Sequence, residues 1–461
     1  MISQLPPLCT ELPYPGDSAN YFGKLRHMNW PVILDSANTG CPAGRYDILA
    51  ADPFITIETR ADKSIIQYRD GHSHHSEADP FVILETLLQP YRQPQTDLPF
   101  AGGAIGYFAY DLGRRIETLP NRADDVENIP DMAVGIYDWA VVTDHKLKRC
   151  WLTSFGLDPR THDIWSSLQT QLLSADADDL SLFQVHGELT SNLDPQQYQQ
   201  AFDRIKNYIT EGDCYQVNLA KRFEIKAEGD PWYAYQIQRQ QNAAPFSAFF
   251  STGNVAVMSS SPERLLQVHQ NQVETKPIKG TRPRDLTDPL KDAELADALQ
   301  HSLKDRAENL MIVDLLRNDL GKVCKPGSIK VPKPFALESF ATVHHLVSTI
   351  TGTLADDETA VSLLRACFPG GSITGAPKLR AMEIIEELEP NRRGVYCGSV
   401  GYIGFDGNMD SNITIRTLVF SDQRLRFWAG GGIVADSQAE AEHQEVHDKA
   451  AAMFKLIEAL R

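Results

Sequence analysis

The chain has 461 residues, of which 61 are aspartate or glutamate and 44 are lysine or arginine, so its formal net charge is −17. This balance excludes a dedicated nucleic-acid binder and a protein held on anionic membranes, because both need a basic face. No apolar run approaches the roughly 18 residues of a membrane-spanning helix, and the N-terminal residues do not form a signal peptide, so we expect a cytoplasmic protein. Seven scattered cysteines without a CxxC pair predict neither disulfides nor a zinc site.

The first third of the chain is rich in predicted strands. Short apolar or alternating runs bounded by turn residues lie at 31–35, 46–51, 54–60, 63–68, 133–143 and 149–154. The glycine-rich run 100–106 predicts a bulged strand or a tight loop. His72, His74 and His75 lie in a polar segment without a fitting fourth ligand, so we interpret them as a solvated turn and not as a metal site.

Residues 174–194 are rich in Ser, Asp and Ala and show little periodicity. We interpret them as the connection between an N-terminal region, 1–173, and a C-terminal region, 195–461. The second region begins with a helix predicted over 195–211, with Asp194 as its N-cap. Further helices are predicted over 292–323, from about Pro377 onward and over 438–460, and strands over 399–405, 412–421 and 425–429. Helices and strands without a regular alternation predict an α+β fold.

Two of the long predicted helices carry paired acids. Asp305 and Glu308 are three residues apart, as are Glu442 and Glu445, so each pair lies on one helix face. If the two faces meet, their carboxylates suit Mg²⁺, which takes a few carboxylates together with waters and substrate oxygens. By itself the spacing favours solvated helix faces, with Lys449 forming an ordinary ion pair four residues after Glu445.

A basic run follows an isolated acid in the segment 259–284. Glu263 comes directly after Pro262, and Lys279 lies among Lys276, Arg282 and Arg284. Neighbouring cations and partial burial would lower the pKa of the Lys279 amine and make it a nucleophile. The run alone favours a solvated or anion-binding loop.

Three further features could receive an anionic ligand. The run 368–380, Phe-Pro-Gly-Gly-Ser-Ile-Thr-Gly-Ala-Pro-Lys-Leu-Arg, lacks the phosphate-loop spacing but could bind a carboxylate through backbone N–H groups. Arg416 lies in an otherwise apolar predicted strand, where a substrate carboxylate would be a suitable partner. His345 could donate to a ligand oxygen. For each of them an ordinary structural pairing remains the alternative.

Taken together, these segments resemble the chorismate-utilising enzymes, the family that includes anthranilate synthase large subunits, aminodeoxychorismate synthases, and isochorismate and salicylate synthases. The motifs that carry the resemblance lie at 260–264, 304–319, 368–378, 413–417, 430–437 and 442–449. They cover about 195–455, and residues 12–150 are similar to the family's N-terminal region. The resemblance implies a large α+β unit in which two antiparallel sheets pack face to face with helices outside.

The resemblance also implies roles for single residues. Glu308 and Glu445 would hold Mg²⁺, with Asp305 and Glu442 in support, and Glu263 would be the general acid and base. The chorismate carboxylates and ring would be contacted by Arg416, Lys449, Gly431, Gly432, Thr374, Gly375, His345 and Tyr402. Residues 34–37 and 44–47 are similar to the stretch that lines a tryptophan pocket in relatives, which makes Ser36 a candidate for such a pocket.

Two positions distinguish the members of the family. Gln216 stands where isochorismate and salicylate synthases carry a general-base lysine, which disfavours activation of water. Residues 277–281, Pro-Ile-Lys-Gly-Thr, resemble the members that make 4-amino-4-deoxychorismate for p-aminobenzoate and folate, in which Lys279 would add to C2 before ammonia enters at C4. No Gly-x-Cys-x-Gly motif is present, so a separate glutamine amidotransferase subunit is implied as the ammonia source. Anthranilate formation and a non-catalytic chorismate-binding protein remain the alternatives.

Overall fold

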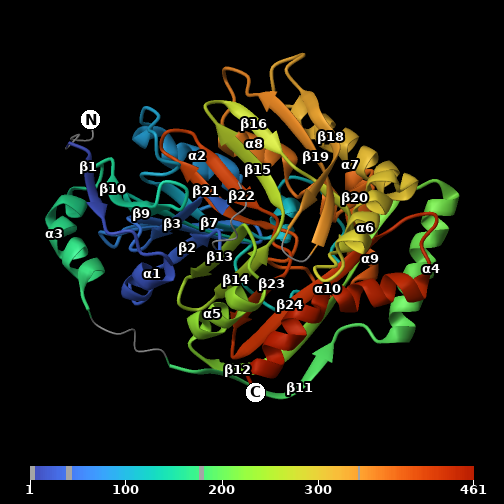
Figure 1. The fold of residues 1–461 in the computed structure, drawn as a ribbon. Coiled ribbons are helices and arrows are strands. Elements are labelled where there is room, and N and C mark those ends of the chain that lie inside the picture. The colour runs from blue at the N-terminus through green and yellow to red at the C-terminus, as the bar shows by residue number, and fades with distance from the viewer. Residues whose placement is uncertain (1–5, 38–43, 176–180, 341–342) are drawn as a thin grey trace.

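The computed structural model describes residues 6–37, 44–175, 181–340 and 343–461. Over these residues the strands form two twelve-stranded sheets in which every pairing between named strands is antiparallel. The helices lie outside the two sheets (Figure 1). The predicted fold class is therefore confirmed.

The first sheet runs, in spatial order, β1 (Leu8–Leu12), β10 (Arg149–Ser154), β9 (Trp139–Asp144), β3 (Tyr46–Ala50), β2 (Val32–Asp35), β13 (Phe246–Ser251), β14 (Ala256–Ser261), β23 (Thr417–Ser421), β24 (Arg424–Ile433), β12 (Gln216–Gly229) and β11 (Phe183–Ser191), with β20 (Gly375–Ala376) paired to β12. The second sheet runs β17 (Ile278–Pro283), β19 (Val343–Thr353), β16 (Gln272–Thr275), β15 (Arg264–His269), β22 (Met409–Asn412), β21 (Ser399–Gly404), β7 (Gly103–Phe108), β8 (Met132–Tyr137), β4 (Ile55–Arg60), β5 (Lys63–Tyr68) and β6 (Ser73–Ser76), with β18 (Lys330–Ser339) paired to β19.

A buried apolar core lies between the two sheets. Val32 and Phe250 of the first sheet belong to the same cluster as Ile105 and Tyr107 of the second. The rings of Tyr107 and Phe250 meet edge to face with centroids 5.9 Å apart. Strands that are buried on both faces explain why β7, β8 and β9 are continuous apolar runs rather than alternating ones.

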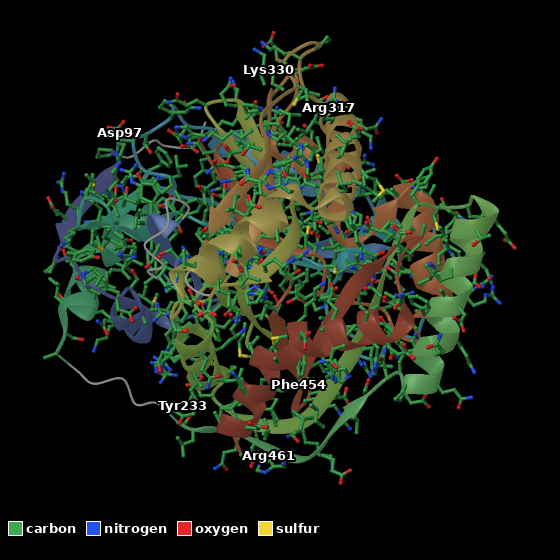
Figure 2. The ribbon with its side chains drawn as sticks, turned by 45° about the vertical axis from the view of Figure 1, so that its right-hand side comes forward. Asp97, Tyr233, Arg317, Lys330, Phe454 and Arg461 are labelled. Atoms are coloured by element: carbon green, nitrogen blue, oxygen red, sulfur yellow. The ribbon has the colours of Figure 1, made fainter. Side chains whose placement is uncertain are left out.

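The helices cover the outer faces of the sheets. Their bounds are α1 (Ala19–Leu25), α2 (Pro80–Leu88), α3 (Pro159–Leu173), α4 (Pro195–Glu211), α5 (Pro231–Gln241), α6 (Pro289–His301), α7 (Leu303–Gly321), α8 (Ala360–Cys367), α9 (Lys378–Leu388) and α10 (Ala439–Ala459), with short 3₁₀ turns η2 (Gln89–Tyr91), η3 (Tyr110–Arg115) and η4 (Gly371–Ile373). Helices α4, α5, α9 and α10 pack on the first sheet, and α6 and α7 pack on the second. In Figure 2, Arg317 of α7 lies near the top of the view and Phe454 of α10 lies near the bottom.

At two of the points where the chain passes from one sheet to the other, the sequence patterns predict a single continuous strand. The predicted strand 133–143 is two strands, β8 and β9, which belong to different sheets and meet at the buried Asp138. The Asp138 carboxylate accepts the Leu157 N–H and the Ser154 hydroxyl, which secures the bend. The predicted strand 412–421 likewise divides into β22 and β23, and Arg416, with φ of 51°, lies in the crossing between them.

Three other predictions needed correction. The single helix predicted over 292–323 is two helices, because Ser302 ends α6 and its hydroxyl caps α7 by accepting the Asp305 N–H. Part of the predicted connection 174–194 forms β11, which pairs with β12. The histidines at 72–75 do not lie in a turn alone, since Ser73–Ser76 is the exposed edge strand β6. The predicted helix over 195–211 and its Asp194 cap are confirmed as α4, with a capping box to Gln197.

Both sheets contain strands from each side of the segment 174–194. The division into the regions 1–173 and 195–461 therefore stays a prediction about the sequence. Among the described residues no helix is long and apolar enough to cross a membrane. The six cysteines that the structure describes are all free, and Cys41 lies outside the described residues.

Candidate active site

A cavity of about 690 Å³ lies where the second sheet, α7, α10 and the glycine-rich turn 370–376 meet β24 of the first sheet. Ten of the predicted site residues line it. They are Glu263, Lys279, Asp305, Glu308, His345, Arg416, Gly432, Glu442, Glu445 and Lys449. Residues more than 180 positions apart in the chain are thus brought to one concave surface, as small-molecule sites require.

Lys279 and Glu263 share one wall of the cavity. Lys279 lies in β17, where the register with β19 shifts between Ile278 and Thr281, and its Nζ donates to the Ser372 carbonyl over 3.0 Å. Glu263 is 6% exposed, and its Oε1 has no hydrogen-bond partner among the described residues. The acid and the amine therefore both face the cavity beside Ser372.

Burial moves the pKa values of both groups toward their neutral forms. Desolvation raises the pKa of the Glu263 carboxyl, although the nearby Lys279 amine opposes the rise. Desolvation also lowers the pKa of the Lys279 amine, against the attraction of Glu263 and Glu308. A neutral amine is a nucleophile and a protonated carboxyl is a proton donor, so burial suits each group to a chemical role.

Gly280 allows β17 to lie close to the helices at this point. Its φ is +87°, and a Cβ there would come within 2.9 Å of Asp305 Cβ and of Leu299 Cδ1. Only glycine meets both the backbone conformation and the close approach. Gly280, the residue after Lys279, therefore sets the distance between β17 and α7.

The four predicted metal-ligating acids face this cavity from α7 and α10. Desolvation is the main cause that raises the pKa values of Glu308 and Glu442, and in each case a neighbouring carboxylate adds to the rise. A Cβ on Gly431 would lie 3.2 Å from Glu442 Oε2 and 3.4 Å from Glu445 Oε1, so these two carboxylates converge over a bare stretch of backbone. Crowded carboxylates with no side chain between them form a donor set that fits a hard divalent cation.

Side-chain cations pair with three of these acids, and the fourth, Glu442, accepts the Ser437 hydroxyl. Arg282 pairs with Asp305 over 3.0 Å, and Lys449 pairs with Glu445 over 2.6 Å. Lys304 lies 4.0 Å from Glu308. Among the described residues no three acidic or histidine side chains stand close enough to share one ion as they are placed. Carboxylates of this kind are suitable ligands for a divalent cation, but in the present arrangement three of them pair with basic side chains instead of converging on one point.

Arg416 and His345 also line the cavity. The Arg416 side chain is partly buried and makes no hydrogen bond or ion pair with the described residues, and desolvation lowers the pKa of its guanidinium. His345 Nδ1 lies 2.8 Å from Thr281 Oγ1, and burial together with the Arg416 charge lowers the pKa of the imidazole to about 4. A partly buried, unpaired guanidinium needs an anion, for which a substrate carboxylate is well shaped.

Three predicted ring-pocket residues do not line this cavity. Thr374 is fully buried, and its hydroxyl is bonded to the carbonyls of Gly370 and Gly371. Gly375 pairs with Val217 of β12, and a Cβ there would meet the Gln216 carbonyl at 2.1 Å, so it lies behind the surface. Tyr402 lies on β21 and lines the second cavity described below. The assignment of Tyr402 to the ring pocket stays a prediction, although β21 places this residue at the second cavity, between the two sheets.

The structure adds residues that the sequence patterns missed. Asn218, Tyr396 and Trp428 line the cavity, and the last two rings stack with centroids 5.9 Å apart. Gln216 is fully buried, neither atom of its amide has a partner among the described residues, and a Cβ on Gly432 would meet its Nε2 at 2.9 Å. Asn218 could have been suspected from the segment 212–218, but no periodicity identifies an aromatic pair from two distant elements.

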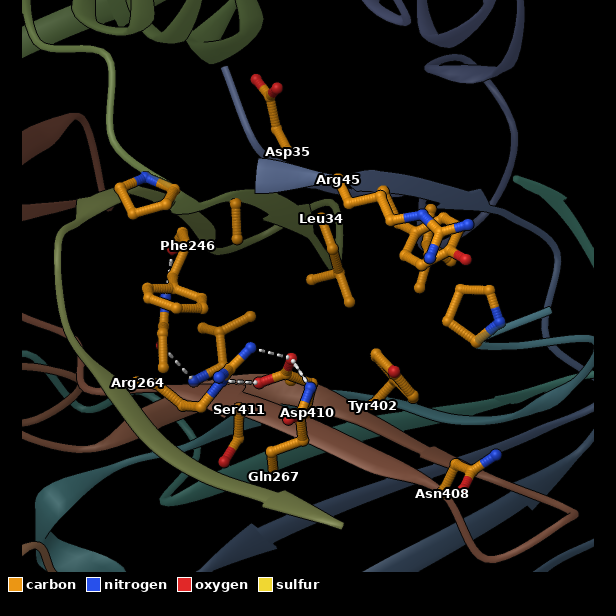
Figure 3. A pocket seen from close by; sticks show the side chains of 18 of the residues that line it. Leu34, Asp35, Arg45, Phe246, Arg264, Gln267, Tyr402, Asn408, Asp410 and Ser411 are labelled. Carbon is orange, nitrogen blue, oxygen red and sulfur yellow. Dashed lines mark hydrogen bonds and ion pairs between the residues drawn. The ribbon is translucent and has the colours of Figure 1, made fainter. Parts of the chain in front are cut away.

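A second cavity of about 450 Å³ opens between the two sheets (Figure 3). Leu34 and Phe246 come from the first sheet, and Tyr402 and the ion pair of Arg264 with Asp410 come from the second. Ser36 is not part of its lining, because its N–H and hydroxyl both donate to Asp47 Oδ1. The residues that precede Ser36, Leu34 and Asp35, do line the cavity.

The comparisons with known proteins agree with this geometry. The model of a family described as chorismate binding enzyme matches residues 33–455. Aminodeoxychorismate synthase component 1 of Salmonella typhimurium is 48% identical over 453 residues, which are 97% of this chain and 98% of that protein. Anthranilate synthase component 1 of Acetivibrio thermocellus is 36% identical, over 95% of this chain and 92% of that one. The crystal structure of anthranilate synthase component I from Streptococcus pneumoniae superposes with a TM-score of 0.79 at 33% identity, covering 90% and 92% of the two chains.

Proposed function

The chain belongs to the chorismate binding enzyme family, and from that premise we propose that it converts chorismate and ammonia into 4-amino-4-deoxychorismate. The observation that carries the proposal is the Lys279 amine, which lies in the cavity beside Glu263 and is shifted by burial toward its neutral, nucleophilic form. The similarity to aminodeoxychorismate synthase component 1 over nearly the whole chain supports the same reaction.

Binding would begin with the two carboxylates of chorismate. The unpaired Arg416 guanidinium takes one of them in fork geometry, and the backbone around Gly432 leaves room for the other. Lys449 is close enough to exchange its bond with the Gly430 carbonyl, 3.0 Å away, for a substrate oxygen. Neutral His345 donates or accepts at the ring substituents without adding charge.

The chemistry would then proceed in two displacements. The Lys279 amine attacks C2 of the ring, the diene shifts, and the C4 hydroxyl leaves as water with a proton from Glu263. Ammonia attacks C4, the diene shifts back, and the C2–nitrogen bond to Lys279 breaks. The added amine loses its proton to the Glu263 carboxylate, so the net change is chorismate and ammonia to the 4-amino product and water.

Glu308, Glu442, Glu445 and Asp305 would hold Mg²⁺ beside the substrate. When bound there, the ion neutralises and orients a substrate carboxylate. Three of these acids, Asp305, Glu308 and Glu445, would have to give up Arg282, Lys304 and Lys449 as partners for this to happen. These three cations then become available to the dianionic substrate.

Ammonia would be supplied by a separate glutamine amidotransferase subunit in the cytoplasm. The sequence contains no Gly-x-Cys-x-Gly motif, and Cys214 and Cys397 are both buried, with pKa values raised chiefly by desolvation. A buried thiol with a raised pKa is a poor nucleophile, so these residues do not serve as a glutaminase. The designation component 1 of the Salmonella typhimurium relative is consistent with a two-component enzyme.

We also propose that the second cavity takes tryptophan, as the resemblance of residues 34–37 and 44–47 implied. Its wall combines the aromatic rings of Phe246 and Tyr402 with the charged groups of Arg45 and Asp410. That combination suits a zwitterionic amino acid with an aromatic side chain.

One experiment tests the proposed reaction directly. The purified chain is incubated with chorismate, Mg²⁺ and ammonium at alkaline pH, and the product is identified by chromatography and mass spectrometry. We expect 4-amino-4-deoxychorismate. Anthranilate as the product would instead establish the alternative that the family also contains, and unchanged chorismate would mean that the chain binds without catalysis.

A further inference from the structure

A buried ion pair lies directly beneath the wall of the active-site cavity that carries Ser372. Glu389 follows the last residue of α9, and Arg393 follows four residues later. Their side chains are each 1% exposed. Arg393 Nε donates to Glu389 Oε2 over 2.8 Å and Nη2 donates to Oε1 over 2.6 Å, so the pair is bidentate. Geometry of this kind fixes a guanidinium in one orientation.

The same guanidinium bonds two segments that line the cavity. Nη1 donates to the Ile373 carbonyl over 3.1 Å, and Nη2 donates to the Asn218 carbonyl over 3.0 Å. Ile373 and Asn218 both belong to the cavity lining. Glu389 adds a third bond to this arrangement, because its Oε1 accepts the Ala220 N–H of β12 over 2.9 Å. The pair therefore clamps the glycine-rich turn to β12.

The clamp reaches the reactive lysine through one peptide unit. The Ile373 carbonyl that Arg393 holds is the next carbonyl after that of Ser372, which accepts the Lys279 Nζ. The turn is also fixed on its other side, since the Asn218 N–H donates to the Thr374 carbonyl over 2.8 Å. A rotation of the turn would move the Ser372 carbonyl and with it the Lys279 amine.

Arg393 also supports the aromatic wall. Its guanidinium carbon lies 5.7 Å from the centre of the Tyr396 ring and 4.8 Å from that of Tyr110. Tyr396 in turn stacks on Trp428, and both rings line the cavity. One fully buried side chain thus touches three parts of the cavity wall while lining none of it.

We propose that Arg393, held by Glu389, is a positioning residue that sets the placement of the Lys279 amine through the 372–373 peptide. The inference rests on the proposed function only in that Lys279 is taken to be the nucleophile. A buried ion pair brings little net stability compared with apolar packing, because both charges lose their hydration. The pair does fix the positions of two backbone carbonyls, those of Ile373 and Asn218, by hydrogen bonds that an apolar side chain could not make.

The test compares two arginine-to-lysine substitutions. Arg393→Lys keeps the charge but cannot make all of the bonds from one planar group. Arg239→Lys is the matched control, because Arg239 forms a bidentate pair with the buried Asp35 and contacts no residue of the active-site cavity. With chorismate and ammonium as substrates, we expect Arg393→Lys to lower kcat by about 10- to 100-fold with KM for chorismate changed by less than about threefold. Arg239→Lys should keep kcat within about twofold.

A second readout does not depend on turnover. Competitive labelling with acetic anhydride, followed by mass spectrometry, compares the reactivity of Lys279 with that of Lys276, which is paired with Glu338. We expect the ratio to change at least about threefold in Arg393→Lys and to stay constant in Arg239→Lys. If Arg393→Lys does not fold, Glu389→Asp keeps both charges, shortens the acid by one methylene, and carries the same expectations.

The outcomes separate the two proposals. The product that the unchanged protein makes decides the proposed function, whereas the labelling ratio decides the role of Arg393 whichever product is formed. Unchanged Lys279 labelling in a folded Arg393→Lys or Glu389→Asp protein would overturn the positioning role. A rise in KM without a fall in kcat would also overturn it, because that pattern belongs to substrate binding and not to placement of the nucleophile.

Discussion

At the scale of single residues, burial is what suits Lys279 to act as a nucleophile and Glu263 to act as a proton donor. Neither residue is unusual in the sequence, where one belongs to a basic run and the other follows a proline. In the cavity, desolvation favours the neutral form of each and the two groups partly oppose one another's shift. The same physics leaves Arg416 as a partly buried cation without a side-chain partner among the described residues, and it keeps His345 neutral.

Lys279→Met should abolish formation of the 4-amino product, because no other described lysine of the cavity bonds the Ser372 carbonyl. We expect a loss of at least about 10³-fold in kcat, in the range seen when a nucleophile is removed. Lys276→Met is the control, since Lys276 lies three residues away in an ion pair with Glu338 and outside the cavity lining. Mass spectrometry of quenched reactions should show a chorismate-derived adduct on unchanged protein and none on the variant. A Lys279→Met protein with full activity would rule out the covalent step.

His345 should make the protein less stable in mild acid. Its folded pKa of about 4 lies below the ordinary value of 6.5, so below pH 6.5 the unfolded chain takes up a proton that the folded chain refuses. The stability that neutral His345 contributes is therefore present above pH 6.5 and is lost as the pH falls toward 4. Between pH 7 and pH 5 the loss is about 2 kcal/mol.

Urea unfolding at the two pH values measures this effect. His345→Gln should show a free energy of unfolding that falls by about 2 kcal/mol less over the same interval than that of the unchanged protein. His74→Gln, which replaces an exposed histidine of β6, should behave like the unchanged protein. Equal pH dependence in the His345 variant and the unchanged protein would contradict the assignment of a buried neutral imidazole.

At the scale of elements, the point at which a helix begins decides where the acidic pairs of α7 and α10 lie. Each presents an acidic pair at a spacing of three residues, which on its own is typical of a solvated face. The cap at Ser302 starts α7 at the residue after it, so that Asp305 and Glu308 fall in its first turns, facing α10 across the cavity. A helix running without interruption from 292 would place these carboxylates differently around its axis.

Glu445→Gln should weaken the binding of a divalent cation. Neutralising one carboxylate removes a charged oxygen donor and leaves Lys449 without its partner, so we expect the dissociation constant to rise at least about tenfold. Electron paramagnetic resonance of Mn²⁺, used as a stand-in for Mg²⁺, measures free ion directly and needs no turnover. Glu440→Gln, on an exposed position of the same helix, should leave the affinity unchanged. Identical Mn²⁺ affinities for the two variants would argue against a metal held by α10.

At the scale of the whole molecule, the packing of the two sheets against each other creates both cavities. The active-site cavity lies where β17 of one sheet approaches β24 of the other with α7 and α10 across it, and the second cavity lies between β2, β13, β21 and β22. The crossing of the chain at 413–416 connects the two, because β22 lines the second cavity and Arg416 lines the first. A ligand in either cavity therefore contacts both sheets.

Tryptophan should stabilise the folded protein by binding in the second cavity. A ligand that binds only the folded state at 100 times its dissociation constant adds about 2.7 kcal/mol. Differential scanning calorimetry should show a Tm that rises with tryptophan concentration and does not rise with alanine. Phe246→Ala removes an aromatic wall of the cavity and should abolish the shift. A Tm that is unaffected by tryptophan in the unchanged protein would reject this use of the cavity.

The sequence by itself determined the fold class, many of the strands within 31–154 and 399–429, and the α4 cap, and it named ten of the residues that line the active-site cavity. It predicted none of the strands β11–β20. Local chemistry suffices for the fold class, these strands and the cap, since capping and apolar alternation are written in contiguous residues. The roles of the ten cavity residues came from the family resemblance, because their local spacing alone favoured solvated helix faces and loops. The resemblance to the chorismate-utilising enzymes then joined segments that periodicity alone could not join.

Only the tertiary structure decided where the chain changes sheets and which way single side chains face. Asp138 and residues 413–416 interrupt runs whose apolar pattern is continuous, because strands buried on both faces carry no alternation to mark a break. The directions of the Tyr402 and Thr374 side chains were also decided by the tertiary structure, because they depend on which sheet the neighbouring strands join. Tyr402 faces the second cavity, and Thr374 bonds within its own turn. The Arg393–Glu389 pair has the spacing of an ordinary helical ion pair, and only its burial beneath the Lys279 wall distinguishes it.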